Sequence, residues 1–316
     1  MRLERGSRGI RRPNVALVRV AQAEPCRSPS PLPQRIIWRL FEMNMSTTTP
    51  SFVLPPLPEL QETTVFARKI CYYDTGRGSP LVLVHGLGGD ADQWAYCLDE
   101  LAASHRVIAV DLLGFGRSDK PLIDYRIAGF VEVLDRFLAT IGIASASLLG
   151  HSLGGWIVAA FALRFPHKIE KLILNDAAGI DDGAIAIPVD LNISTRASLR
   201  EAFDCMFYDK SIVTEELIDL AYSLHLARSD GYTIRSVLET FTKPHEKLDG
   251  KLAVLRMPAL ILWGEDDAIT PLSMAHAFHR RIAGSRLQII ARCGHLPPLE
   301  KPNEFTAAVT SFLRPT

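Results

Sequence analysis

The chain has 316 residues, with 35 basic and 35 acidic side chains, 47% apolar residues and 22% charged residues. This composition is typical of a globular protein and excludes a largely disordered chain, which is less apolar and more highly charged. The balanced charge argues against nucleic acid as a partner, because phosphate binding needs a basic excess. No apolar run approaches 18 residues, so no membrane span is expected. The five scattered Cys predict neither a zinc site nor a disulfide framework and favour a reducing, cytoplasmic location.

The N-terminal segment differs from the rest of the chain. Residues 1–44 contain nine Arg, no Lys and three Glu, and nine of the 20 Pro lie before residue 59. We therefore expect residues 1–58 to form a disordered tail rich in Arg and Pro. An organelle transit peptide is one alternative. A mis-assigned start is the other, with Met43 or Met45 as a later start.

From about residue 60, short apolar runs alternate with amphipathic stretches of helical period. Most of the runs from Leu81 onward are apolar on both faces, which is typical of a buried parallel sheet. The first two runs are more polar and lie close together, so they predict a hairpin at the sheet edge. The expected strands are Thr64–Phe66, Ile70–Tyr73, Leu81–His85, Val107–Asp111, Ala146–Leu149, Lys171–Leu174, Ala259–Trp263 and Leu287–Ala291.

Helical patterns separate most of the later strands, which predicts an α/β fold with right-handed connections. Residues 181–251 contain no buried strand and read as mostly helical. About 70 residues far exceed the length that a crossover needs, so we expect this interval to form a helical insertion over a core of residues 59–180 and 252–316. The expected core helices are Asp92–Ala103, Arg126–Ile141, Leu153–Phe165, Leu272–Ile282 and Asn303–Leu313.

The strongest local motif is a G-x-S-x-G sequence over residues 150–154, between a predicted strand and a predicted helix. A turn this tight needs small neighbours, which Gly150 and Gly154 supply. The Ser152 hydroxyl is then expected above the sheet edge at a helix N-terminus, where the helix dipole favours negative charge. An ordinary helix-capping serine is the alternative interpretation.

A Gly-rich turn, His85-Gly86-Leu87-Gly88-Gly89, directly follows a predicted strand. Its backbone N–H groups can point inward, and the N–H of Leu87 together with that of Leu153 could form an oxyanion hole. A phosphate-binding loop is disfavoured, because neither G-x-G-x-x-G nor G-x-x-x-x-G-K-[ST] is present.

The last two predicted strands are followed by an acidic cluster and by a histidine. His295 lies where an α/β sheet presents functional groups, after the last strand. Residues 265–267 are three carboxylates that follow the preceding strand, and Asp267 is the predicted partner that orients His295. Asp266 is expected to be a surface or capping residue. Asp176 also ends a strand and is the second choice.

Together these segments resemble the α/β-hydrolase superfamily over about residues 60–316. The order Ser152, Asp267, His295 matches that family's nucleophile, acid and base. Residues 85–89 resemble its oxyanion loop, residues 111–118 its D-x-x-G-x-G-x-S loop, residues 264–271 its acid loop and residues 294–302 its histidine loop. The resemblance implies an eight-stranded, mostly parallel sheet with helices on both faces and a helical cap at residues 181–251.

The resemblance also implies a reaction. Serine at position 152 favours acyl transfer over the alkyl-enzyme chemistry of members that use Asp. We expect a carboxylesterase or lipase-like serine hydrolase that acts on a small-molecule ester, with Leu87 and Leu153 as oxyanion donors and with no metal or organic cofactor. The alternatives are a C–C hydrolase of aromatic ring-fission products, an acyltransferase and a non-catalytic ligand-binding relative.

Two features bear on these alternatives. The C–C hydrolases often have Trp directly after the catalytic His and an Arg in the cap, whereas His295 is followed by Leu296. The sequence predicts no oligomeric state. Six cap residues are expected either to line a pocket or to pack the cap's own interior: Phe203, Met206, Phe207, Tyr208, Tyr222 and Leu226.

Overall fold

The structure is a computed structural model that describes residues 55–181 and 195–314. The predicted N-terminal tail, residues 1–58, lies outside the described residues except for 55–58. Within that short piece, Leu57 already packs against the apolar core. No helix in the described parts of the chain is long and apolar enough to cross a membrane.

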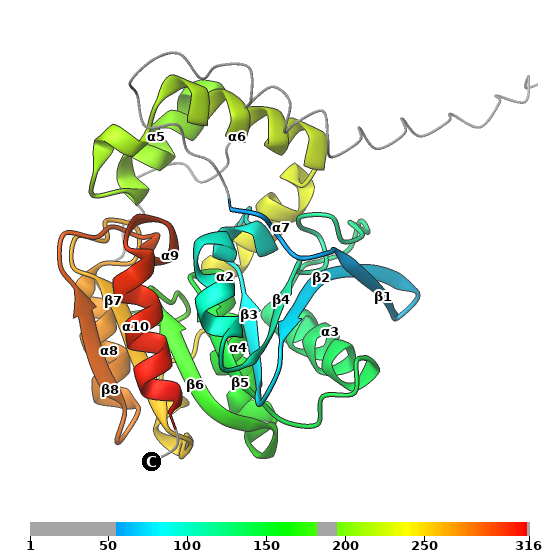
Figure 1. The fold of residues 1–316 in the computed structure, drawn as a ribbon, viewed down its shortest axis with the longest axis vertical. Coiled ribbons are helices and arrows are strands. Elements are labelled where there is room, and N and C mark those ends of the chain that lie inside the picture. The colour runs from blue at the N-terminus through cyan, green and yellow to red at the C-terminus, as the bar shows by residue number, and fades with distance from the viewer. Residues whose placement is uncertain (1–54, 182–194, 315–316) are drawn as a thin grey trace, which may run out of the picture. The chain divides into compact units, whose positions relative to one another are not determined.

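The core is an eight-stranded sheet in the order β1-β2-β4-β3-β5-β6-β7-β8 (Figure 1). All eight expected strands are present, with ends that differ by a few residues. Their bounds are Gln61–Val65 (β1), Arg68–Gly76 (β2), Pro80–Val84 (β3), Arg106–Val110 (β4), Ala146–His151 (β5), Ile169–Asn175 (β6), Ala259–Gly264 (β7) and Arg286–Ile290 (β8).

The pairing confirms a mostly parallel sheet with a hairpin at one edge. β1 and β2 are antiparallel, with Thr63 opposite Ile70, and β2 also runs antiparallel to β4. The neighbouring strands from β3 to β8 are parallel to one another. β8 is an exception among the apolar runs, because it is an edge strand and its side chains alternate between exposed and more buried positions.

Apolar clusters lie on both faces of the sheet, because successive side chains of a strand point to opposite faces. In β3, Val82 and Val84 belong to one cluster and Leu81 and Leu83 to the other. The first face is covered by α3 (Ile127–Thr140), α4 (Leu153–Arg164) and α8 (Leu272–Arg281), and the second by α2 (Ala95–Ala102) and α10 (Pro302–Leu313). These five helices confirm the expected core helices.

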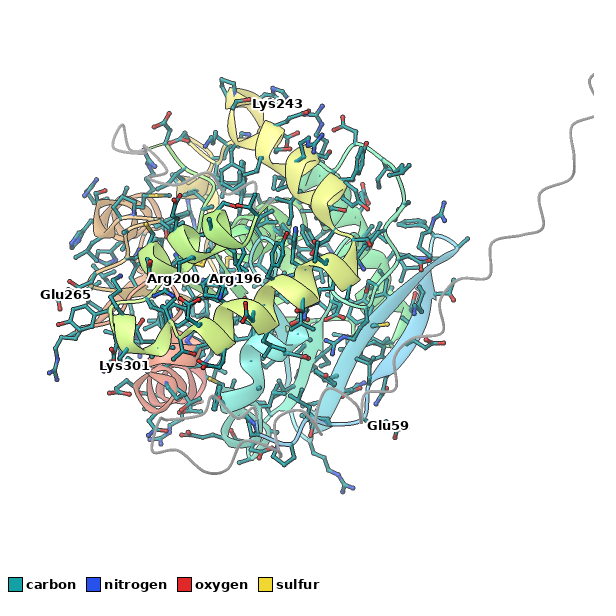
Figure 2. The ribbon with its side chains drawn as sticks, turned by 90° about the horizontal axis from the view of Figure 1, so that it is seen from above. Glu59, Arg196, Arg200, Lys243, Glu265 and Lys301 are labelled. Carbon is teal, nitrogen blue, oxygen red and sulfur yellow. The ribbon has the colours of Figure 1, made fainter. Side chains whose placement is uncertain are left out.

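Three α-helices occupy residues 195–251 of the predicted cap: α5 (Arg196–Met206), α6 (Glu215–Arg228) and α7 (Gly231–Phe241). Leu199, Phe207, Val213 and Ile218 form a small apolar interior of their own. Figure 2 shows Arg196 and Arg200 on α5 next to α6, where both pair with Glu215. The division into core and cap stays a prediction, and residues 182–194 lie outside the described residues.

Candidate functional site

The predicted site residues follow the carboxyl ends of parallel strands, where α/β sheets bind ligands. Ser152 follows β5, Asp267 follows β7 and His295 follows β8. Because these strand ends share one edge of the sheet, residues more than 100 positions apart in the sequence are neighbours in space. Ser152 and His295 both line a single cavity of about 270 Å³ at this edge.

Ser152 occupies a strained turn between β5 and α4. Its backbone has φ 52° and ψ −116°, a conformation that residues with a Cβ rarely adopt. The glycines of the motif are needed for close approach: a Cβ on Gly150 would lie 2.3 Å from the carbonyl oxygen of Gly154, and a Cβ on Gly154 would lie 2.1 Å from that of Val84. The turn is further fixed by the Ser152 N–H, which donates to the carbonyl oxygen of Asn175 at 3.0 Å.

His295 and Asp267 form a buried hydrogen-bonded pair. The distance between His295 Nδ1 and Asp267 Oδ2 is 2.7 Å, and neither side chain is more than 4% exposed. Asp267 Oδ1 accepts the N–H groups of Ile269 and Thr270, and the Thr270 hydroxyl donates to Oδ2 at 2.6 Å. Burial acts to raise the pKa of Asp267, but His295 and the donors of Thr270 outweigh it and hold this pKa below its ordinary value.

The His295 backbone is fixed by two contacts from other parts of the chain. Its N–H donates to the carbonyl oxygen of Met206 at 2.6 Å. Its carbonyl oxygen lies 2.7 Å from Nε2 of His151, so this ring nitrogen is the donor. Burial lowers the pKa of His151 to about 3, so its ring is neutral at neutral pH. Through its Nε2–H group, His151 therefore supports the loop of His295.

Asp176, the second-choice acid, lies beside this pair. One oxygen of its carboxyl group is within 4.8 Å of the facing atoms of Asp267 and His295. Its Oδ1 accepts the N–H of Gly264 at 2.9 Å, whereas Oδ2 has no hydrogen-bond partner among the described residues. The structure therefore assigns the direct contact with His295 to Asp267 and adds a second carboxyl close by. Asp266 is exposed, as expected of a surface residue.

The Gly-rich turn is held by a buried histidine that orients one peptide group. His85 Nε2 accepts the N–H of Leu112 at 3.0 Å, so the ring proton is on Nδ1, which donates to the carbonyl oxygen of Gly86 at 2.7 Å. Gly89 N–H donates to the same oxygen. The Gly86–Leu87 peptide is planar and trans, so fixing this carbonyl turns the N–H of Leu87 in the opposite direction.

The second predicted donor, Leu153, is the first residue of α4. Its N–H has no acceptor within the helix, because the first turn of a helix leaves its N–H groups free. The helix dipole adds partial positive charge at the same place. Gly86 lies close to this turn: a Cβ added there would be 3.2 Å from Cβ of Ser152. The arrangement can stabilise an oxyanion that forms on a group attached to Ser152.

Residues 111–118, the D-x-x-G-x-G-x-S segment, hold the chain that directly follows the Gly-rich turn. Buried Asp111 accepts the N–H of Ala91 at 2.8 Å through Oδ1 and the N–H and Nε–H groups of Arg117 through Oδ2. A Cβ on Gly116 would lie 2.5 Å from this carboxylate, so glycine is required there. The motif therefore fixes the position of the chain just after the turn and does not reach the cavity itself.

The cavity is mostly apolar, and the predicted cap supplies much of its wall. Of the six residues singled out in the predicted cap, Phe203 and Met206 line the cavity, Phe207 and Tyr222 belong to the small apolar cluster of α5 and α6, and Tyr208 and Leu226 are exposed. The apolar lining consists of Leu87, Leu199, Phe203, Met206, Ala221, Leu224, Ile234, Ile269, Leu296 and Leu299.

One part of the cavity is polar, and sequence reasoning missed it. Arg228 at the end of α6 pairs with Asp90, which follows the Gly-rich turn. Burial raises the pKa of Asp90 to about 6, against the opposing charge of Arg228. His225 also lines the cavity, with its Nδ1 3.1 Å from Asp230 Oδ1. In the sequence, the spacing of three residues between His225 and Arg228 indicates only that both lie on the same face of a helix. It does not reveal that Asp90 is the partner of Arg228.

Comparison with known proteins shows which family the chain belongs to. A family model described as alpha/beta hydrolase fold matches residues 79–302. The 2-hydroxy-6-oxo-2,4-heptadienoate hydrolase of Pseudomonas putida is 32% identical over 76% of this chain and 91% of its own length. The chain therefore belongs to the α/β-hydrolase family, and at this level it is a serine hydrolase.

Solved structures agree on the fold but not on one substrate. A meta-cleavage product hydrolase from Pseudomonas fluorescens superposes with a TM-score of 0.70 at 25% identity, covering 80% of this chain and 96% of that one. An esterase from Exiguobacterium antarcticum superposes with a TM-score of 0.71 at 26% identity, covering 81% and 99%. The bond that is cleaved thus differs among proteins that share this fold.

Proposed function

We propose that the chain hydrolyses carboxylic esters through an acyl-enzyme. The observation that carries the proposal is the His295–Asp267 pair beside a strained serine in a mostly apolar cavity. Ser152 is the nucleophile, His295 the general base and Asp267 the acid that holds the base in place. The N–H groups of Leu87 and Leu153 form the oxyanion hole. The substrate is a small molecule with an apolar acyl or alcohol part.

The reaction has two halves that use the same groups. The Ser152 oxygen attacks the ester carbonyl carbon while His295 takes the hydroxyl proton, and the oxyanion is held by the two N–H groups. The tetrahedral intermediate collapses, and His295 gives the proton to the leaving alcohol. Water then attacks the acyl-enzyme, again losing its proton to His295, and the acid leaves as Ser152 is regenerated. No step in this scheme requires a metal or an organic cofactor.

Hydrolysis of C–C bonds in aromatic ring-fission products is the second candidate. The 32% identical relative from Pseudomonas putida, whose name describes a dienoate hydrolase, favours it. The cap arginine that often accompanies this activity has a counterpart in Arg228, which lines the cavity. Two observations favour the ester instead: Arg228 already pairs with Asp90, and Leu296 stands where the C–C hydrolases often have Trp.

The test compares both substrate classes in one set of assays. The wild type and Ser152→Ala are given p-nitrophenyl acetate, butyrate, octanoate and palmitate, and in parallel a 2-hydroxy-6-oxo-dienoate ring-fission product. Saturable ester hydrolysis that disappears in Ser152→Ala supports the proposal. The dependence of the rate on acyl chain length then shows how long an acyl group the cavity accepts. Turnover of the dienoate without ester turnover favours the second candidate. Added alcohol that diverts product to a new ester indicates acyl transfer.

A further inference from the structure

Asp176 is a buried carboxyl group that the proposed mechanism leaves unused. It follows β6 with a backbone φ of 44°, in the left-handed region, and its side chain is fully buried. Oδ1 is fixed by the N–H of Gly264, so the carboxyl faces the end of β7, where the loop of Asp267 begins. Oδ2 has no partner among the described residues. A buried polar atom without a partner costs about 1–3 kcal/mol, which calls for an explanation.

The neighbours of Asp176 supply one. Its carboxyl group, the Asp267 carboxylate and the His295 ring place one atom each within 4.8 Å of one another, and all three residues are buried. Cys293 and Glu300, in or next to the histidine loop, are the other titratable side chains that interact electrostatically with the Asp176 carboxyl group. No Lys or Arg of the described chain forms an ion pair with either carboxylate. A site with one imidazole and two carboxyls in a dry environment cannot hold two negative charges at small cost.

Hydrogen bonding decides which of the two carboxyls is charged. The Asp267 carboxylate accepts bonds from two backbone N–H groups, from the Thr270 hydroxyl and from His295, whereas the Asp176 carboxyl group accepts, among the described residues, only the backbone N–H of Gly264. Donors stabilise a carboxylate, so the charge resides on Asp267 and Asp176 keeps its proton. Burial first, and the charge of Asp267 second, hold the pKa of Asp176 well above its ordinary value.

We propose that Asp176 and Asp267 form a carboxyl pair that carries a single negative charge beside His295, and that Asp176 takes over this charge when Asp267 is neutral. Asp267 holds the charge while it is present. When Asp267 is made neutral, Asp176 releases its proton to solvent and its carboxylate stabilises the imidazolium that forms when Ser152 gives its proton to His295. This inference rests on the proposed serine-hydrolase function.

The test uses a fluorophosphonate probe, because labelling of Ser152 requires an active base and does not depend on the natural substrate. Labelling rates are measured from pH 5 to 9 for the wild type, Asp176→Asn, Asp267→Asn and the double variant. Loss of the acid in such a triad costs about 10⁴-fold when nothing replaces it. We expect Asp267→Asn to lose only about 10²-fold, Asp176→Asn less than about 3-fold with an unchanged pH profile, and the double variant at least about 10-fold more than Asp267→Asn.

Controls separate this effect from general damage. Asp266→Asn combined with Asp267→Asn changes an exposed neighbour and should label like Asp267→Asn alone. If Asp176→Asn does not fold, Asp176→Gly replaces it, because glycine adopts a φ of 44° without strain. A double variant that labels within about 3-fold of Asp267→Asn overturns the shared charge, as does an Asp176→Asn rate that falls about 100-fold. A wild type that is not labelled contradicts the proposed function instead.

Discussion

At the scale of single residues, the backbone of Ser152 is where function opposes stability. Its φ of 52° and ψ of −116° cost a residue with a Cβ about 1–3 kcal/mol, whereas glycine adopts them freely. Both Ser152→Gly and Ser152→Ala remove the hydroxyl of the proposed nucleophile. We expect Ser152→Gly to be more stable than Ser152→Ala by about 1 kcal/mol in urea unfolding. At exposed Ser223 in α6 the order should reverse, with Ala above Gly by about 1 kcal/mol. Equal stabilities at position 152 would contradict stored strain.

His85 gives a second prediction, because it orients the peptide of Leu87 through the carbonyl oxygen of Gly86. His85→Leu removes the donor and should lower kcat about 100-fold with little change in KM, since one oxyanion donor contributes about 10²–10³. His85→Asn retains a donor near the position of Nδ1 and should recover part of the loss. Burial lowers the pKa of His85 to about 4, so this effect should not vary between pH 6 and 8.

The measurement for His85 is the affinity for a boronic acid inhibitor alongside kcat. Boronic acids form a tetrahedral adduct with serine, so their binding should weaken in parallel with kcat/KM. His276→Gln, which changes an exposed histidine of α8, is the control and should leave both unchanged. Normal inhibitor binding in folded His85→Leu would show that His85 does not act through the oxyanion hole.

The site residues could be predicted from the sequence where local sterics dictate residue types. Gly150 and Gly154 are required by contacts of 2.3 and 2.1 Å, so the serine turn is visible in the sequence. The loop of Asp267 and the loop of His295 were likewise located by the strands that precede them. The partner of Arg228 could not be predicted, because Asp90 is 138 residues away and the pair depends on how α6 lies over the Gly-rich turn.

At the scale of elements, the histidine loop is bound to the end of α5 by one carboxylate. Glu300 accepts the N–H groups of Tyr208 at 3.0 Å and of Gly294 at 3.3 Å, and the N–H of His295 donates to Met206. A Cβ on Gly294 would lie 2.3 Å from the carbonyl oxygen of Met206, so the two segments are in direct contact. Through these bonds, the segment that carries Phe203 and Met206 into the cavity also positions His295.

Glu300→Gln tests this connection. Oε2 of Glu300 accepts the N–H groups of Tyr208 and Gly294, and Oε1 accepts that of Asp209. The amide offers only one oxygen, so at least one of these N–H groups loses its acceptor. The loss should cost about 0.5–1.5 kcal/mol of unfolding free energy, because the bonds of Tyr208 and Asp209 are exposed to solvent. We expect kcat to fall about 10-fold and KM to change less than about 3-fold, because the loop of His295 becomes less well positioned. Glu304→Gln, at an exposed position of α10, should change neither. A loss of stability with full kcat would limit Glu300 to a structural role.

Strand and helix patterns predicted the elements because burial sets their periodicity. The strands between β3 and β7 are buried on both faces and read as apolar runs. The short helix α9 (Pro297–Glu300) was missed, since four residues carry no helical period. The edge position of β8 was missed as well, because its exposed face is visible only once the strand order is known.

At the scale of the whole molecule, the buried titratable groups oppose one another. Burial lowers the pKa of His85 and His151 to about 4 and about 3, so unfolding below pH 6.5 takes up protons at both. Burial raises the pKa of Asp90 to about 6 and holds that of Asp176 well above its ordinary value, so unfolding releases protons from both carboxyl groups. Stability rises with pH wherever the unfolded chain binds more protons. The two kinds of group therefore offset each other in mildly acidic solution.

Replacing Asp176, one of the two buried carboxyl groups, should reveal its contribution to the pH dependence of stability. Above an ordinary carboxyl pKa of about 3.9, the unfolded chain loses the Asp176 proton while the folded chain keeps it, so rising pH favours unfolding through this residue until its folded pKa is reached. Asp176→Asn removes this pH-dependent loss of stability. The unfolding free energy of the variant minus that of the wild type, measured in urea, should therefore be larger at pH 8 than at pH 4.5. The increase should be on the order of 1.4 kcal/mol for each unit by which the folded pKa is raised within this range. Asp266→Asn, which is exposed, should show no such gain. A difference between Asp176→Asn and wild type that is the same at both pH values would mean that Asp176 is ionised in the folded chain, and the two carboxyls could not then share one charge.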